Sequence, residues 1–191
     1  EEVILTAMES DRFEEYLHVV TRLLQSDGRV SFDGEYYELH EALLLPRPQR
    51  PSGPPILVGG NGPKRTLPLT ARFADVWNGV FITAERFAEL NTRLDRLLER
   101  HKRSPKDIRR TLMTGLVFGA DDGALRARLD ERDGTIASLQ ERGLIVGTPA
   151  AVVEQLGVLA EAGVERVMLQ WLDLDDLEGL TALAKGVLSQ V

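Results

Sequence analysis

Short apolar runs that alternate with amphipathic helical segments constrain the fold of this chain more than any other feature. Runs flanked by turn residues are typical of strands that are buried on both faces of a parallel sheet. Helical periodicity follows each run, so crossover helices are predicted to cover the sheet. The sequence therefore predicts an α/β fold with about four parallel strands. The runs are Pro55–Gly60, Ala74–Gly79, Thr111–Phe118 and Arg166–Trp171.

Between these runs, apolar residues recur at intervals of three and four, which is the pattern of amphipathic helices. Thr83 is predicted to cap a long helix, and Thr148 and Pro149 are predicted at the N-cap and first position of a later one. Pro68 must lie in the first turn of its helix or kink it. The predicted helices cover Asp11–Leu24, the segment around Leu67–Phe73, the segment from Thr83 to Ser104, the segment from Thr148 to Gly163, and about Leu177–Leu188.

Two segments interrupt the alternation. Residues 30–54 begin with two short β-prone runs about Asp33-Gly34, which predict a hairpin, and continue as a proline-rich connector. Residues 119–146 are charged, with leucines at helical spacing, and indicate an insertion of one or two helices.

The chain has 191 residues, of which 43% are hydrophobic and 28% charged, so residues 1–191 are predicted to form a single domain with one core.

Charge and residue usage exclude several classes of function. The 23 basic and 30 acidic residues give a net charge of -7 and are spread along the chain, which argues against nucleic acid as a partner. Cysteine is absent and His18, His40 and His101 are widely separated, so no metal site is predicted. The first residues form no apolar stretch, so we expect no membrane association and a cytoplasmic location by default.

A glycine-rich turn is predicted where the first apolar run meets its helix. Parallel α/β folds bind ligands at the C-terminal ends of strands, and Gly59, Gly60, Asn61 and Gly62 occupy such an end. Glycine lets the backbone approach an anion, the amides of a helix N-terminus favour phosphate, and Lys64-Arg65 add charge. The turn lacks the spacing of a dinucleotide fingerprint and of a P-loop. It is either a phosphate site or only a tight turn, and its context must decide.

Trp77 and Asn78 end the second apolar run, at the same predicted edge. An indole there either walls an aromatic cofactor or fills the top of the fold, and the Asn78 amide is able to donate to a ring carbonyl. Trp171 has the same two interpretations. Asp75 is predicted to accept backbone amides. Gly147-Thr148-Pro149 is interpreted as an ordinary capped helix start.

No set of side chains in the sequence supplies a convincing nucleophile with its base, so the catalytic residues stay unknown. Paired carboxylates such as Asp121-Asp122 and Asp175-Asp176 fall in predicted solvated loops. Hydrolase chemistry is therefore disfavoured. This scarcity fits a protein whose reactive group is a cofactor.

The order and spacing of several motifs resemble the luciferase-like monooxygenase family over about residues 11–190. No single motif is decisive, but together they make the resemblance specific. In chain order the motifs are Phe32-Asp33-Gly34-Glu35-Tyr36-Tyr37, Leu45-Pro46-Arg47-Pro48, Pro54–Gly62, Ala71–Asn78, Gly147–Val152 and Gly163–Val167.

The resemblance implies the C-terminal part of a (β/α)8 TIM barrel that binds the deazaflavin coenzyme F420, or alternatively FMN, at its C-terminal mouth. In this family the loop matching Gly59–Gly62 lies beside the phosphate end of the cofactor, and the positions matching Trp77 and Asn78 line the pocket region. We therefore expect an oxidoreductase that transfers a hydride between F420 and a small organic substrate. The alternatives are an FMN-dependent two-component monooxygenase that uses oxygen, and a non-catalytic cofactor-binding or assembly fragment.

The resemblance also implies that a family member carries about four further strands before the region that matches this chain, because such a barrel needs about 250 residues. We therefore expect this chain alone to be incomplete. An open half barrel exposes strand edges and apolar surface. The expected partner is a second copy of the chain, in a homo-oligomer, or the remaining N-terminal half of the barrel.

Overall fold

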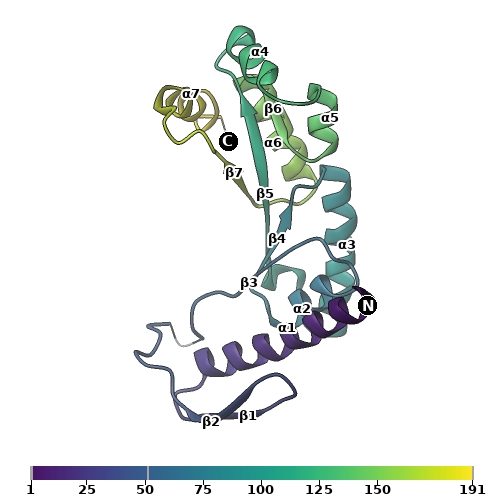
Figure 1. Ribbon diagram of the computed structural model, residues 1–191, viewed down its shortest axis with the longest axis vertical. Helices are drawn as coiled ribbons and strands as arrows, with labels where there is room; N and C mark the ends of the chain where they lie inside the picture. The colour runs from purple at the N-terminus through teal and green to yellow at the C-terminus, as the bar shows by residue number, and fades with distance from the viewer. Residues whose placement is uncertain (1, 51, 191) are drawn as a thin grey trace.

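A computed structural model describes residues 2–50 and 52–190 (Figure 1). The helices are α1 (Glu2–Gln25), α2 (Thr66–Phe73), α3 (Ala84–Arg100), the short 3-10 helix η1 (Pro105–Asp107), α4 (Asp122–Asp130), α5 (Ile136–Glu141), α6 (Pro149–Glu161) and α7 (Leu177–Val187). The strands are β1 (Val30–Asp33), β2 (Glu38–Ala42), β3 (Leu57–Gly59), β4 (Val76–Val80), β5 (Arg109–Phe118), β6 (Ile145–Gly147) and β7 (Arg166–Gln170).

Within the described residues, five parallel strands form the main sheet around the long strand β5. β3 pairs with β4, and β4 pairs with the first half of β5, in which Val80 lies opposite Met113. β7 pairs with residues 111–115 of β5, and β6 pairs with residues 116–118. A parallel sheet joined by helical crossovers is the α/β class predicted from the alternating runs, and that prediction is confirmed.

Strand β6 was not predicted, because Ile145–Gly147 falls within residues 119–146, which were expected to be helical. The insertion consists of α4 and α5 and is followed by a strand. An apolar run this short does not distinguish a strand from a buried helical turn by its periodicity. β5 extends past the end of β4, so residues 116–118 need backbone partners that β6 supplies. The tertiary position of this run decides its conformation.

Helices α2, α3 and α6 bury their apolar sides against one face of the sheet (Figure 1). Thr83 caps α3 as predicted, because its Oγ1 accepts the Arg86 N–H at 3.3 Å. On the other face, Leu57 is 50% exposed and Arg109 is exposed, so this face lies open in the described part of the chain. The core on the covered face includes Leu67, Trp77, Phe87, Leu90, Leu94, Leu98, Leu112 and Val152.

The hairpin predicted within residues 30–54 is confirmed as the antiparallel pair of β1 and β2. Glu15 of α1 accepts the three successive N–H groups of residues 35–37 at 2.8, 2.9 and 3.2 Å. Arg72 of α2 donates to Glu14 and to the ring of His18. Helix α1 therefore connects the hairpin to the first βα unit of the sheet.

Several helix boundaries also agree with prediction. Pro68 lies in the first turn of α2, and Pro149 begins α6. Thr148 occupies the N-cap position, but its side chain makes no cap hydrogen bond. Helix α1 begins at Glu2, earlier than the predicted Asp11. None of the helices in residues 2–50 and 52–190 is both long and apolar enough to span a membrane.

Candidate functional site

The glycine-rich turn lies where it was predicted, between the end of β3 and the start of α2. Gly60 N donates to Asn78 O at 2.9 Å, which holds the turn against β4. Gly60 has a φ of 124°, a backbone conformation that favours glycine. A Cβ at Gly62 would lie 2.7 Å from Thr66 Oγ1. The backbone path at Gly60 therefore favours glycine, and a side chain at residue 62 would displace the Thr66 hydroxyl.

Two side chains named in the sequence prediction, Asn61 and Trp77, hold this turn in place. Asn61 Nδ2 donates to Val80 O at 2.6 Å, and Asn61 Oδ1 accepts from Val80 N at 3.0 Å. Trp77 Nε1 donates to Gly60 O at 3.0 Å. The Trp77 ring is fully buried and stacks on Phe87, with ring centroids 4.7 Å apart. The indole therefore fills the fold, the second of its two interpretations, and touches the turn through Nε1.

Asn78 lies on the face of the sheet opposite to that of Trp77, because successive strand residues alternate sides. It is 6% exposed, and its Oδ1 accepts the hydroxyl of Thr111 at 2.9 Å. Among the described residues, Asn78 Nδ2 has no hydrogen-bond partner. The face that helices α2 and α3 leave open thus carries an amide donor next to the glycine-rich turn.

Backbone amides at the start of α2 are the open donors of this region. No hydrogen bond within residues 2–50 and 52–190 involves the N–H groups of Asn61, Gly62 or residues 64–66. The Thr66 hydroxyl makes none either. Helix N-termini present N–H groups and partial positive charge to anions. The turn therefore offers a cluster of donors suited to a phosphate or carboxylate.

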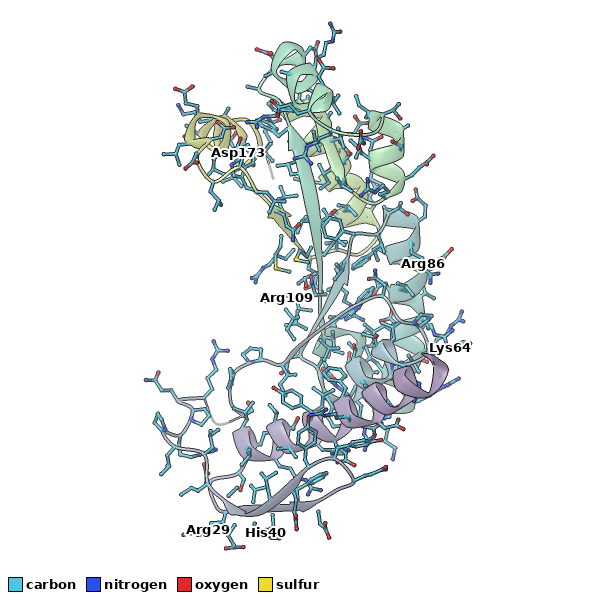
Figure 2. All side chains as sticks on the ribbon, viewed as in Figure 1. Arg29, His40, Lys64, Arg86, Arg109 and Asp173 are labelled. Atoms are coloured by element: carbon cyan, nitrogen blue, oxygen red, sulfur yellow. The ribbon has the colours of Figure 1, made fainter. Side chains whose placement is uncertain are left out.

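Arg65, one of the two cations that follow the turn, is directed elsewhere. Arg65 Nη1 pairs with Asp11 of α1 at 3.3 Å. Lys64 is exposed, and Figure 2 shows it beside the helices α1 and α3. The charge of Arg65 is therefore engaged by Asp11, and an anion at this turn would be bound mainly by amide dipoles.

A second polar group occupies the C-terminal ends of β5 and β7. Trp171 Nε1 is buried and has no hydrogen-bond partner in the part of the chain that the structure describes, and the centroids of the Trp171 and Phe118 rings are 6.4 Å apart. Nearby, Arg128 of α4 donates to Asp173 and Asp176, and its hydrogen bond to Asp173 raises the pKa of the guanidinium. Sequence reasoning missed Arg128, because its partners are more than forty residues away along the chain.

The helix start at Gly147-Thr148-Pro149 lies against another helix. A Cβ placed on Gly186 of α7 would lie 2.8 Å from the Pro149 ring. This close packing supports its interpretation as an ordinary helix start. It leaves the turn before α2 as the strongest candidate among the predicted loops.

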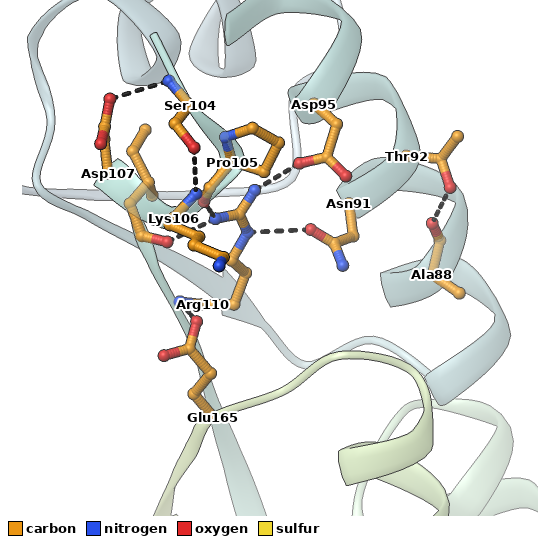
Figure 3. Close-up of polar contacts among 11 residues, drawn as sticks. Ala88, Asn91, Thr92, Asp95, Ser104, Pro105, Lys106, Asp107, Arg110 and Glu165 are labelled. Atoms are coloured by element: carbon orange, nitrogen blue, oxygen red, sulfur yellow. Dashed lines mark hydrogen bonds and ion pairs between the residues drawn. The ribbon is translucent and has the colours of Figure 1, made fainter.

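The N-terminal edge of the sheet is built differently (Figure 3). The side chain of Arg110 is 7% exposed and donates to Asp95 and, at 3.0 Å, to Asn91 of α3. It also donates to the carbonyls of Pro105 and Ile108. The guanidinium thus joins α3, η1 and β5, and its donors are used within the protein.

Carboxylates at this edge also accept backbone amides from neighbouring strands. Asp75 Oδ2 accepts from Ile56 N at 2.8 Å, which confirms the structural role predicted for it. Glu165 Oε1 accepts from Arg110 N at 3.0 Å. Because these polar groups are paired, the N-terminal edge is not a candidate ligand site.

Comparison with known proteins identifies the family of the chain. The model of the luciferase-like monooxygenase family matches residues 8–140. An F420-dependent glucose-6-phosphate dehydrogenase from Kineococcus radiotolerans is 30% identical over 181 residues, which cover 92% of this chain and 50% of that protein. The chain spans half or less of the length of the curated relatives that it matches.

Solved structures share the fold at lower sequence identity. The coenzyme F420 dependent tetrahydromethanopterin reductase of Methanopyrus kandleri superposes with a TM-score of 0.74 at 17% identity, over 94% of this chain and 63% of that one. The oxygenating constituent of 3,6-diketocamphane monooxygenase from Pseudomonas putida, solved with FMN, has a TM-score of 0.67 at 15% identity, over 93% and 62%. The parallel α/β fold is accordingly of the (β/α)8 barrel type that was predicted. The chain belongs to the luciferase-like monooxygenase family.

Proposed function

We propose that the protein is an oxidoreductase that transfers a hydride between the deazaflavin coenzyme F420 and a small organic substrate. The observation that carries this proposal is a cluster of N–H groups, those of Asn61, Gly62 and residues 64–66, which have no hydrogen-bond partner within the described residues and lie at the C-terminal edge of a parallel sheet. Ligands of parallel α/β folds bind at this edge. The relative from Kineococcus radiotolerans, which is named for its dependence on F420, supports the choice of cofactor.

The donor set of the turn fits the phosphate end of such a cofactor. The N–H groups of Asn61, Gly62 and residues 64–66 and the hydroxyl of Thr66 are all donors. Among the described residues, the carboxylate that pairs beside this turn is Asp11, and its partner is the Arg65 side chain and not an N–H group of the turn. An uncompensated set of donors at a helix N-terminus binds an anion without needing a salt bridge.

Asn78 and Thr111 would extend the site from the phosphate end toward the ring of the cofactor. Thr111 fixes Asn78 Oδ1 and so orients the amide, which leaves Nδ2 to donate to a ring carbonyl. Trp77 supports the turn from the core side through Gly60 O. The bound cofactor supplies the hydride chemistry, while the residues of this chain bind and orient it.

We also propose that a second polypeptide segment completes the site, either the other part of the barrel or a second copy of the chain. Parallel sheets are normally covered on both faces. In this chain, Leu57 on the open face is 50% exposed, and Leu172, Leu174 and Leu177 after β7 are 68–81% exposed. Burial of these side chains against a partner would remove a large apolar surface from water.

Fluorescence titration of the full-length protein with F420 tests the proposal, with Gly60→Asp as the informative variant. A carboxylate at residue 60 would face the expected phosphate and weaken binding by charge repulsion and strain, by about tenfold or more. Gly157→Asp is the matched control, because it adds the same charge on an exposed position of α6 with nothing within 4 Å. Wild-type protein that binds neither F420 nor FMN refutes the assignment, and unchanged affinity in Gly60→Asp removes the phosphate role.

The second candidate function is an FMN-dependent monooxygenase that uses oxygen. It is favoured by the similarity of fold to a monooxygenase solved with FMN. The same turn would then hold the phosphate of FMN. Oxygen consumption that depends on reduced FMN, and is not supported by F420, would select this alternative.

A further inference from the structure

Gly60, the residue after β3, forms one hydrogen bond of the ladder between β3 and β4 and then turns away from it. Gly60 N donates to Asn78 O, as the next residue of a parallel strand would. In a regular parallel ladder the carbonyl of the same residue then accepts the second following N–H, which is that of Val80. Gly60 O instead accepts from Trp77 Nε1, at the positive φ of Gly60. Val80 N therefore needs another acceptor.

The side chain of Asn61 supplies that acceptor. Its Oδ1 accepts from Val80 N at 3.0 Å, and its Nδ2 donates to Val80 O at 2.6 Å. A carboxamide carries the same donor and acceptor as a peptide group. Asn61 thus extends the sheet by one rung beyond the last residue of β3, using its side chain in place of its backbone.

The same device occurs once more among the described residues, at β6. Gln155 of α6 donates through Nε2 to Val146 O at 2.9 Å and accepts through Oε1 from Val146 N at 3.2 Å. There the amide closes the edge of a buried strand. Gln155 therefore provides a control for Asn61 at a different place in the fold, where the same amide also accepts from Gln140 Nε2 and donates to Ala151 O.

We propose that Asn61 is a positioning residue of the phosphate site and that its side chain does not touch the ligand. Both groups of its carboxamide are used by Val80, while the N–H groups of Asn61 and Gly62 stay outside the ladder. Trp77 acts with it by holding Gly60 O. The two side chains fix the donors before the ligand arrives, which lowers the ordering cost of binding. This inference rests on the proposed function, since it takes the turn to be the phosphate site.

Ligand pairs that differ only in the phosphate end test the proposal. The dissociation constants of FMN and riboflavin, and of the deazaflavin nucleoside 5′-phosphate and the phosphate-free nucleoside, are measured for wild-type protein, Asn61→Ala and Gln155→Ala. In Asn61→Ala the preference for the phosphate-bearing ligand should fall by about tenfold, while affinity for the phosphate-free ligand stays nearly constant. Gln155→Ala loses the same pair of bonds to a strand residue, together with those to Gln140 and Ala151, and should keep the preference.

Hydrogen exchange of the Val80 amide in the ligand-free protein supplies the second readout. Asn61→Ala removes its acceptor, so exchange at Val80 should become about tenfold faster. A residue that contacted phosphate directly would lower the preference without changing this rate. If Asn61→Ala does not fold, Trp77→Phe, which frees Gly60 O and keeps an aromatic ring, should show the same loss of preference.

The outcomes separate the two proposals. Wild-type protein without any preference for phosphate-bearing ligands overturns the proposed function. If the wild type shows the preference and Asn61→Ala retains it, the positioning role alone is overturned. The same holds if Asn61→Ala loses the preference while exchange at Val80 stays unchanged. Loss of both the preference and the Val80 protection, with Gln155→Ala unaffected in its preference, establishes it.

Discussion

The two edges of the parallel sheet treat their polar groups in opposite ways. At the N-terminal edge, the Arg110 side chain donates to other groups of the protein, and the Glu165 carboxylate accepts the Arg110 N–H (Figure 3). At the C-terminal edge, the turn before α2 keeps a row of N–H groups without partners in the described residues. The first edge therefore stabilises the fold, whereas the second keeps donors that our proposal assigns to a ligand.

The largest expected effect is at the stabilising edge, in Arg110→Met. Removal of a buried guanidinium leaves Asp95 and Asn91 without their donor, which should lower the free energy of unfolding by about 3 kcal/mol. Urea denaturation measures it. The control is Arg86→Met, which breaks an exposed pair with Glu89 and should cost at most about 0.5 kcal/mol. Equal losses in the two variants would show that the Arg110 network is no stronger than a surface pair.

At the binding edge, Gly60→Ala should lower the free energy of unfolding by about 1–2 kcal/mol, because φ is 124° and L-residues are strained there. The added Cβ would lie 3.4 Å from Thr66 Cγ2. Gly157→Ala, within helix α6, should instead raise stability by about 0.5–1 kcal/mol. The two thermal unfolding midpoints should therefore move in opposite directions, and a stabilised Gly60→Ala would contradict the need for glycine.

Thr66→Val sharpens the contrast by removing one open donor while keeping the shape of the side chain. Affinity for a phosphate-bearing cofactor should fall by about three- to tenfold, with little change in stability. Thr92→Val is the control, since the Thr92 hydroxyl donates to Ala88 O on the exposed side of α3. Titration with FMN and F420 measures the change. If both variants bind like the wild type, the Thr66 hydroxyl has no part in the site.

The smallest effect concerns the hairpin, away from both edges. Desolvation raises the pKa of Glu15, but the N–H groups of residues 35–37 outweigh it and lower the pKa overall. Because the pKa of Glu15 is lower in the folded protein, ionised Glu15 stabilises the hairpin at pH values above about 4.3, the ordinary pKa of glutamate. This contribution is lost as the pH falls through the lower pKa of the folded state.

Amide exchange at residues 35–37, corrected for the intrinsic effect of pH, should therefore accelerate as the pH is lowered from about 5 to about 3. Glu15→Gln should exchange faster at the higher pH and lose this dependence on pH. Exchange that is independent of pH in the wild type would contradict the role of the carboxylate. Exchange at Val80 and Arg110 serves as an internal reference for the two edges.

Much of the sheet could be predicted because local pattern and tertiary role agree there. The runs that became β3, β4, β5 and β7 are apolar and bounded by turn residues, and the residues that begin α3 and α6 were recognised as such. β6 was missed because Ile145–Gly147 is too short to show a period. Its conformation depends on the part of β5 that extends beyond β4.

The candidate site was predicted by position and not by contacts. Gly59–Gly62, Trp77 and Asn78 do meet at one strand edge, but the sequence did not show that Asn61 pairs with Val80 or that Trp77 holds Gly60. Those hydrogen bonds join residues that are seventeen and nineteen positions apart. Arg110 and Arg128 were overlooked for the same reason, since an arginine in sequence carries no sign of its partner.

By itself, the sequence determined the alternation of helices with the strands β3, β4, β5 and β7, the glycine-rich turn at a strand end, and, through the order and spacing of its motifs, the resemblance to the family. The alternation and the turn depend on hydrophobic period and backbone freedom, which are local properties. Only the tertiary structure decided which donors of the turn are used and which stay open. That outcome depends on the register between β3 and β4. The register places Val80 N opposite the carbonyl of Gly60, and because this carbonyl turns away from the ladder, the Asn61 side chain accepts from Val80 N in its place.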